Sequence, residues 1–348
     1  MRKKLLGWFY IALALFGLTP LAMAFAHEAY VLPANEFHAG LKVFSQHPFA
    51  PLLDPAHFKL SVIITICVVS AYALNFLWAA TKPAAAIDRF LKKASPVGPL
   101  IIRLTVGFSF FYSALSAVSF GPELQLSYIH AAHFIQYVEF VIALMFIFGI
   151  FTEVAALIGA AIFAYLIFFF HGYMITYTNY FGEFLALIFF GSRFLSFDRL
   201  AFGKMPWLRK MEKFKDLEVP LVRILYGVAL IYAGYTIKFA HQELTVAVYN
   251  QYHLENFFHN SAAFIAAGAG LSELAIGFFI LIGLATRLTV ITSLVFITLS
   301  LSYFHELLWP HFLLYGISIS LIINSAGRYS VDSALVPWVR RHILRRPA

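Results

Sequence analysis

Charged side chains are scarce in this sequence. Aspartate, glutamate, lysine and arginine together make up 12% of its 348 residues, whereas a soluble domain contains about 25%. A single cysteine, Cys67, excludes an internal disulfide, a CxxC redox pair and a cysteine-rich metal site. Any redox chemistry must therefore come from a bound cofactor or from a partner.

Common catalytic motifs are absent too. The sequence contains no Walker A loop, no Rossmann glycine pattern, no nucleophile elbow and no HExxH pair, so nucleotide use and hydrolysis are unsupported. Apolar residues are abundant instead: 61% of the chain is hydrophobic and the mean hydropathy is +0.80. This composition is typical of a protein embedded in a lipid bilayer.

Apolar runs recur along the chain, and each is close to the roughly 20 residues that cross a bilayer as a helix. They lack the strict alternation of barrel strands, so we expect an all-α integral membrane protein with about nine transmembrane helices. The runs lie at about 60–80, 101–120, 131–150, 153–171, 181–197, 219–240, 263–284, 288–305 and 307–325.

The N-terminus has the pattern of a secretory signal peptide over residues 1–26. A basic start precedes the apolar stretch 5–18, and small residues allow cleavage after Ala24 or after Ala26. An uncleaved signal anchor is the alternative. The aperiodic segment 27–57 is predicted to be an extracytoplasmic loop or short cap.

The distribution of lysine and arginine predicts the topology. If the N-terminal region and segments 81–100, 198–218 and 326–348 face the cytoplasm, 22 of the 25 basic residues lie on that side or at the inner helix ends. The positive-inside distribution then accounts for the net charge of +8, which does not indicate nucleic-acid binding. We expect a multi-pass protein of the cytoplasmic (inner) membrane whose mature N-terminal segment is extracytoplasmic.

The sequence also matches itself, first at an offset of 120 and then at 134. Polar residues recur in order, which general hydrophobicity would not produce. The match predicts two parallel four-helix bundles, because an even number of spans leaves both copies the same way up. The matched pairs are Arg103 with Arg223, Gly107 with Gly227, Tyr112 with Tyr232, Glu123 with Glu243, Glu139 with Glu273, Gly149 with Gly283, Thr152 with Thr286, His171 with His305 and Asp198 with Asp332.

These boundaries predict a domain organisation. It consists of a signal peptide 1–26, an extracytoplasmic segment 27–57, an extra transmembrane helix with a cytoplasmic loop 58–98, repeat 1 over 99–200, a basic cytoplasmic linker 201–218, repeat 2 over 219–333 and a basic cytoplasmic tail 334–348.

Repeat 2 resembles the DoxX family of small four-helix membrane proteins. The resemblance rests on VRILYGVALIYAGYTIKF, on ELAIGFFILIGLATRLTVI and on the closing SAGRYSVDS. Repeat 1 is more divergent, with Val118 in place of the family's lysine and Glu153 in place of its arginine. Some relatives are subunits of thiosulfate:quinone oxidoreductases or are associated with terminal quinol oxidases, so the resemblance implies a redox-linked membrane subunit.

Acidic residues inside apolar runs are the first candidates for function. Glu139 and Glu273 fall well inside the second helix of each repeat, where a carboxylate is costly unless it is paired or protonated. Glu183 lies in repeat 1, near the predicted outer interface. The candidate partners are Arg103 and Arg223 near helix ends, or Tyr112 and Tyr232; a helix-locking hydrogen bond is the alternative to an acid–base role.

Histidines are the second group of candidates. On the predicted topology, twelve of the thirteen lie at or near the outer face, and His171 and His305 end matching helices. Histidine binds metals and transfers protons near neutral pH. His130 and His133 are spaced to share a helix face, and cleavage after Ala26 would make His27 an N-terminal chelator of copper or zinc. The candidate set for a metal or a proton path is His27, His130, His133, His171, His305 and His311. The alternative is interfacial histidines that bond headgroups and loop carbonyls.

Three functions remain open from the sequence. The first is a membrane subunit in respiratory or sulfur redox chemistry that contacts a quinone near the outer face and works with a soluble or membrane redox partner. The second is a proton-coupled transporter or metal-handling protein, and the third is a non-catalytic scaffold. The sequence does not decide whether the protein is an enzyme.

Overall fold

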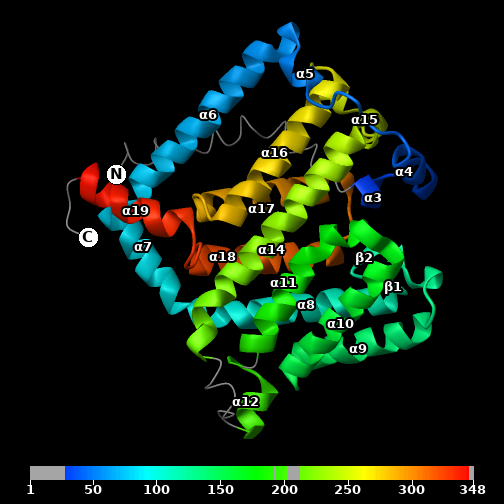
Figure 1. The fold of residues 1–348 in the computed structure, drawn as a ribbon, viewed down its shortest axis with the longest axis vertical. Helices are drawn as coiled ribbons and strands as arrows, with labels where there is room; N and C mark the ends of the chain where they lie inside the picture. The colour runs from blue at the N-terminus through cyan, green and yellow to red at the C-terminus, as the bar shows by residue number, and fades with distance from the viewer. Residues whose placement is uncertain (1–27, 192, 203–211, 345–348) are drawn as a thin grey trace. The chain divides into compact units, whose positions relative to one another are not determined.

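The structure is a computed structural model that describes residues 28–191, 193–202 and 212–344. Helices dominate this part of the chain (Figure 1), because apolar segments in lipid must satisfy their backbone groups internally. The predicted signal peptide 1–26 and His27 lie outside the described residues.

Each predicted apolar run contains a helix. These are α6 Pro55–Ala79, α8 Gly98–Leu115, α9 Ala132–Phe148, α10 Thr152–Phe170, α11 Thr178–Phe190, α14 Glu218–Ala233, α16 Ala262–Ile282, α17 Thr286–Phe304 and α18 Phe312–Asn324. The connecting segments hold α3 Glu28–Val31, α4 Ala34–Gly40, α5 Ala50–Leu53, α7 Lys82–Lys93, α12 Phe197–Phe202, α15 Gln242–Gln251 and α19 Val331–His342, together with a π-helical turn, Gly234–Ala240, that continues α14. Short 3₁₀ turns cover Ser95–Val97, Leu126–Tyr128, His171–Tyr177, Glu212–Leu217, Leu254–Asn256 and Trp309–His311.

Six helical stretches of the described residues are long and apolar enough to cross a membrane. One of them, Thr152–Phe190, covers both α10 and α11, while Ala132–Phe148 and Trp309–Asn324 are apolar but shorter. The protein is therefore a multi-pass membrane protein. The presence of nine transmembrane helices stays a prediction, because only six helical stretches of the described residues are long and apolar enough to qualify.

Connecting segments differ from the sequence-based expectation. A two-stranded antiparallel ladder joins β1 (Val118–Ser119) to β2 (Gly121–Gln125), where only helix and loop were expected. The basic segments 81–100 and 334–348, which were predicted as a loop and a tail, contain α7 and most of α19. Both helices are amphipathic, so a search for continuous apolar runs does not detect them.

The chain forms two compact units that do not coincide with the predicted repeats. The smaller unit comprises Met1–Thr65, Ala233–Ala275 and Thr292–Leu307, and the larger one comprises Ile66–Tyr232, Ile276–Ile291 and Leu308–Ala348. Part of repeat 2 thus belongs with the N-terminal segment. The reason is local contact: in the smaller unit Ser45 donates its backbone N–H to the Ala240 carbonyl, and His57 stacks on Phe264.

Within the larger unit, α8, α9, α10 and α11 form a four-helix bundle in which α8 packs on α9 and α11, and α10 packs on α9 and α11. The α8–α9 crossing is tight at Gly107, because a Cβ there would lie 3.1 Å from the backbone nitrogen of Ile147. At Gly227 of α14, a Cβ would lie 2.7 Å from the backbone nitrogen of Leu281. Small residues of this kind let membrane helices approach closely.

Helices from outside the predicted repeats also pack in the larger unit. Phe76 and Ala80, at the end of α6, share an apolar cluster with Ala285 before α17 and Val339 of α19. Tyr72 of α6 adds a hydrogen bond of 2.9 Å between its hydroxyl and that of Thr289. The extra helix is therefore fastened to the helix ends of repeat 2 by both packing and a polar contact.

Candidate functional site

A polar stripe winds along α9. His133, Gln136 and Glu139 are spaced by three residues, so each is adjacent to the next on the helix surface, and the stripe turns by about 120° around the helix from His133 to Glu139. Their burial increases inward: His133 is exposed, Gln136 is half-buried and Glu139 is fully buried. The stripe thus leads from the protein surface to a carboxyl group inside the bundle.

A pocket lies at the exposed end of this stripe. Its volume is about 580 Å³, and its lining includes His133, Gln136, Gln125 and Val118. Sites that bind small molecules usually measure about 300–1,000 Å³, so this pocket has the volume of such a site, although it is half open to its surroundings.

Behind the pocket, the Ser119 hydroxyl donates a hydrogen bond to Oε1 of Glu139. The second oxygen of Glu139 is buried and has no hydrogen-bond partner among the described residues. The sequence analysis expected an arginine or tyrosine partner for this carboxyl. The hairpin β1–β2 supplies a serine instead, because it folds back over the end of α8.

Glu183 is the most isolated acid of this bundle. Its side chain is completely buried, and neither carboxyl oxygen has a hydrogen-bond partner in the described part of the chain. It lies one turn from Tyr180 on α11, so both face the same side. An unpaired buried carboxyl is costly, which makes Glu183 a candidate for protonation or ligand binding.

Tyr180 is the polar centre of the same bundle. Its hydroxyl lies 2.6 Å from the Ser109 hydroxyl and donates to the Phe120 carbonyl at 2.9 Å. Three acids lie in the same bundle: Glu123 accepts from Tyr177, whose ring is 6.1 Å from that of Tyr180, Glu139 accepts from Ser119, and Glu183 lies one turn along α11. We call Glu123, Glu139, Glu183 and Tyr180 the acid cluster.

Aromatic rings surround Tyr180. The ring of Phe120 lies 4.8 Å away, edge to face, and the rings of Phe110 and Tyr177 lie at 5.8 and 6.1 Å. These rings exclude water from the acid cluster. A dry, aromatic surrounding strengthens every electrostatic interaction inside it.

Glu123 lies on β2, outside the membrane-spanning helices. Its Oε1 accepts a hydrogen bond from the Tyr173 hydroxyl at 3.0 Å and another from Tyr177, while its Oε2 is buried. Burial raises the pKa of this carboxyl above 4.5, and the hydrogen bonds only partly offset that effect. The fold therefore favours the protonated acid.

A second buried polar group lies in the smaller unit. The Lys238 ammonium is 2.7 Å from Oε1 of Glu28 and 3.7 Å from Oε2 of Glu273, and the Thr245 hydroxyl also donates to Glu28 at 2.7 Å. Lys238 and Glu28 are each only 2% exposed. We call Lys238, Glu28, Glu273 and Thr245 the lysine cluster.

Local backbone geometry positions Lys238. The residue lies in the π-helical turn Gly234–Ala240, and such wide turns often occur at functional sites. The glutamate–arginine pairing expected for Glu273 is replaced by this lysine. In repeat 1 the matching residue is Val118, so Glu139 has no lysine at that position.

The two arginines have a different task. In the larger unit, Arg103 donates to the carbonyl of Leu195 at 2.8 Å, and Arg223 donates to the carbonyl of Tyr329 at 2.9 Å. Both guanidinium groups are buried, and Arg223 also donates to the carbonyls of Ile280 and Leu281 in the last turn of α16. Their contacts are structural.

In the part of the chain that the structure describes, neither predicted tyrosine forms a hydrogen bond with a glutamate. Tyr112 is 44% exposed, and its ring lies against Phe111 and Phe312. Tyr232 is half-buried, and its hydroxyl lies 3.2 Å from where a Cβ on Gly172 would be.

The histidines are spread over several elements. His171 and His305 are exposed and follow α10 and α17 with positive φ of 48° and 54°. His130 precedes α9, whose first residue is Ala132, so it does not share a helix face with His133. His311 is buried at the start of α18. Within the described residues, no group of three or more histidine, cysteine, aspartate or glutamate side chains could hold a metal ion.

Sequence reasoning missed Ser119, Gln136 and the partnership of Glu28 with Lys238. Gln136 was detectable, since it lies midway between His133 and Glu139 at helical spacing. Glu28 was not, because it is 210 residues from Lys238 and no periodicity links the two.

The buried carboxyls on apolar helices define the class: a helical, multi-pass membrane protein with ionisable groups in its interior. Residues 219–319 match the family model DoxX. This part of the chain is thus similar to the DoxX family, as the motifs of repeat 2 predicted. Neither the comparison with curated proteins nor that with solved structures found a match.

Proposed function

We propose that this protein is a membrane subunit of a respiratory or sulfur redox system, and that it exchanges protons with a quinone near the outer face. The observation that carries the proposal is the stripe from His133 through Gln136 to Glu139, which runs from two residues of the pocket lining toward a buried acid. Reduction of a quinone consumes two electrons and two protons. The partner supplies the electrons, because the chain has no redox-active pair of its own.

The chemistry of the pocket fits a quinone ring. Val118 and Leu126 offer apolar contact, while the side chains of His133 and Gln136 offer hydrogen-bonding groups for the carbonyl oxygens. Glu139 lies behind them as a group that can hold a proton. The DoxX match supports a membrane redox setting through what the family's relatives do.

Quinone binding tests the proposal directly. A short-chain benzoquinone is titrated into the purified protein in lipid nanodiscs, and binding is followed by quenching of intrinsic fluorescence. We expect His133→Ala to weaken binding about tenfold, which corresponds to the loss of one good hydrogen bond. His130→Ala is the matched control, because His130 does not line the pocket. Absence of binding to the unmodified protein, or equal loss in both variants, would contradict the proposal.

A proton-coupled transporter is the second candidate, and the unpaired Glu183 favours it. Proton flux into proteoliposomes discriminates the two functions. Transport predicts flux that Glu183→Gln abolishes, whereas the redox proposal predicts no flux without a quinone and an electron donor. Metal handling by His27, with copper or zinc, belongs to this second candidate. The scaffold function predicts neither binding nor flux.

We also infer that repeats 1 and 2, over 99–200 and 219–333, arose by tandem duplication. Matched helix ends support this. Gly149 and Gly283 have φ of 70° and 68°, and the amides of Phe151 and Thr152 donate to Asp198 as those of Ala285 and Thr286 donate to Asp332. Duplication predicts that Glu139 and Glu273 occupy equal depths in the bilayer, which depth-dependent quenching of labels at these positions would measure.

A further inference from the structure

Helix α7, Lys82–Lys93, lies outside both predicted repeats and outside the DoxX match, and it carries three distinct faces. Spacing at three and four residues defines them. The packed face is Ala84, Asp88 and Leu91; the apolar face is Ala86, Ile87 and Phe90; the basic face is Lys82, Arg89 and Lys93.

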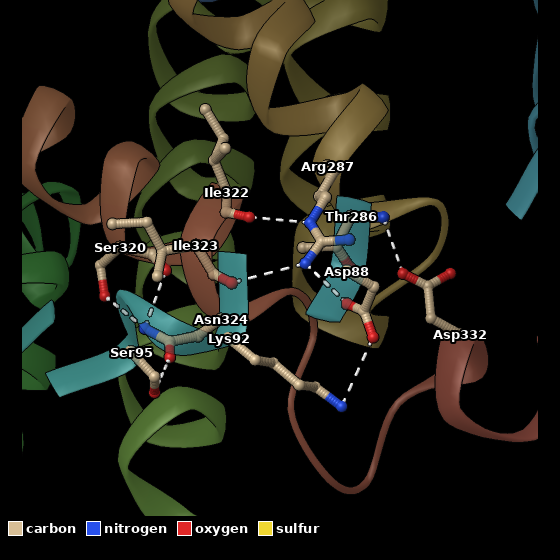
Figure 2. Close-up of polar contacts among 10 residues, drawn as sticks. All are labelled: Asp88, Lys92, Ser95, Thr286, Arg287, Ser320, Ile322, Ile323, Asn324 and Asp332. Atoms are coloured by element: carbon tan, nitrogen blue, oxygen red, sulfur yellow. Dashed lines mark hydrogen bonds and ion pairs between the residues drawn. The ribbon is translucent and has the colours of Figure 1, made fainter. Parts of the chain in front are cut away.

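The packed face is fixed by polar contacts in the larger unit (Figure 2). Arg287 donates to Asp88 at 2.8 Å and to the Ile322 carbonyl, at the end of α18, at 2.7 Å. Just beyond α7, the Ser95 hydroxyl donates to Asn324 at 2.5 Å. The helix is thus held at two points, and its other faces cannot rotate inward.

The apolar face is left uncovered. Phe90 is 72% exposed and Ile87 is 48% exposed, although both follow directly after the apolar helix α6. Exposed aromatic and aliphatic side chains beside a membrane span are stable when lipid covers them. Thr81 accepts a hydrogen bond from the Ala84 amide and so starts α7 as a new helix after α6.

The basic face is exposed as well. Lys82, Arg89 and Lys93 all lie at the surface next to the apolar face. Lys92 differs, since it pairs with Asp88 at 3.4 Å. An amphipathic helix with adjoining apolar and basic faces binds in the plane of a membrane surface, with its cations at the headgroups.

We propose that α7 is an in-plane interfacial helix that binds anionic phospholipid headgroups through Lys82, Arg89 and Lys93, while Ile87 and Phe90 enter the acyl boundary. Charge complementarity selects the occupant: three cations beside an apolar face fit a lipid phosphate joined to an acyl chain. On the predicted topology, this leaflet is the cytoplasmic one. The Asp88–Arg287 contact orients the helix for this task.

Lipid preference tests the basic face. The purified full-length protein is exchanged into vesicles of phosphatidylcholine with increasing phosphatidylglycerol, and the lipids retained after mild detergent extraction are counted by native mass spectrometry. We expect K82Q/K93Q to lower retention of the anionic lipid about tenfold to thirtyfold, because each cation near a membrane surface contributes a factor of about five. Retention of phosphatidylcholine should not change.

The matched control is K213Q/K215Q. It removes the same charge from two exposed lysines of the segment before α14, which belongs to the same larger unit. We expect no more than a twofold change. An equal loss in both variants would show that total charge alone attracts the lipid, and an unchanged K82Q/K93Q would show that α7 does not bind it; either result overturns the proposal.

Insertion of the apolar face is tested separately, with an environment-sensitive fluorophore on a C67S background. We expect the label at F90C to be quenched by doxyl-labelled lipid and shielded from iodide, and the label at R89C to show the reverse. Equal accessibility of both positions to iodide would overturn the in-plane insertion. Thermal unfolding of each variant identifies any that has lost its fold.

Discussion

At the scale of single residues, buried charge is the feature that most constrains this protein. The acid cluster places three carboxyl groups in the bundle that holds Tyr180, and the lysine cluster balances two carboxylates with one ammonium. Charges in a low-dielectric interior are tolerated only when they are paired or neutralised. In the lysine cluster, the charge of Lys238 is paired with that of Glu28. In the acid cluster, Glu183 has no partner among the described residues, so neutralisation by a proton is the solution open to it.

The lysine cluster yields a stability prediction. Lys238→Met leaves Glu28 and Glu273 without their cation, so we expect a loss of about 3–5 kcal/mol in the free energy of unfolding. Denaturant unfolding in detergent micelles measures this loss. Asp216→Asn is the control, because it breaks the exposed pair with Arg328 and should leave stability unchanged. Equal effects from the two variants would show that the buried pair contributes nothing special.

Glu123 yields a prediction on pH. Its pKa in the folded protein is raised above 4.5 by burial, so the folded state holds this proton to a higher pH than the unfolded state does. The contribution of Glu123 to stability is therefore fully present below its unfolded-state pKa and is lost as the pH rises through the folded-state pKa. Comparison of melting temperatures across pH should show this decline in the unmodified protein and a smaller one in Glu123→Gln. Parallel curves for the two proteins would contradict it.

At the scale of helices, chain turns at the ends of apolar segments decide where functional side chains point. His171 and His305 were predicted as ligands from their matching positions. Both have positive φ at the end of a helix, a conformation that favours glycine. The match between the two histidines can therefore reflect a shared turn conformation as well as a shared role as ligands. The sequence alone does not distinguish these two explanations.

Glycine substitution separates the two. We expect His171→Gly and His305→Gly each to raise the free energy of unfolding by about 1 kcal/mol, since glycine relieves the positive φ. Metal content of the purified protein is measured alongside. If the histidines bind a metal, its content should fall in both variants despite the gain in stability. Destabilisation by glycine would show that the imidazoles make contacts that outweigh the backbone strain.

At the scale of the whole molecule, topology underlies every proposal that refers to an outer or an inner face. A reporter that is active only outside the cytoplasm is fused after Gln125, after His253 or after Lys210. We expect activity at the first two positions and none at the third, because the basic segment 198–218 is predicted to be cytoplasmic. Activity after Lys210 would require a different number of spans, and the outer pocket would then face the cytoplasm.

The sequence by itself determined that this is a helical membrane protein, where its apolar helices lie and that repeat 2 resembles the DoxX family. These properties can be read from continuous stretches of sequence. Long apolar runs must be helical in lipid, and each DoxX-like motif lies within one short segment of the chain. It also identified Glu139, Glu183 and Glu273 as acids inside apolar runs, since charge there is rare.

Only the tertiary structure decided their partners. Ser119 reaches Glu139 across a hairpin, and Glu28 reaches Lys238 from a segment 210 residues away. The same holds for the grouping of part of repeat 2 with the N-terminal segment. Pairing between distant residues depends on how helices pack and where turns aim the side chains. Periodicity reports only the face of an element on which a residue lies, and not what that face meets.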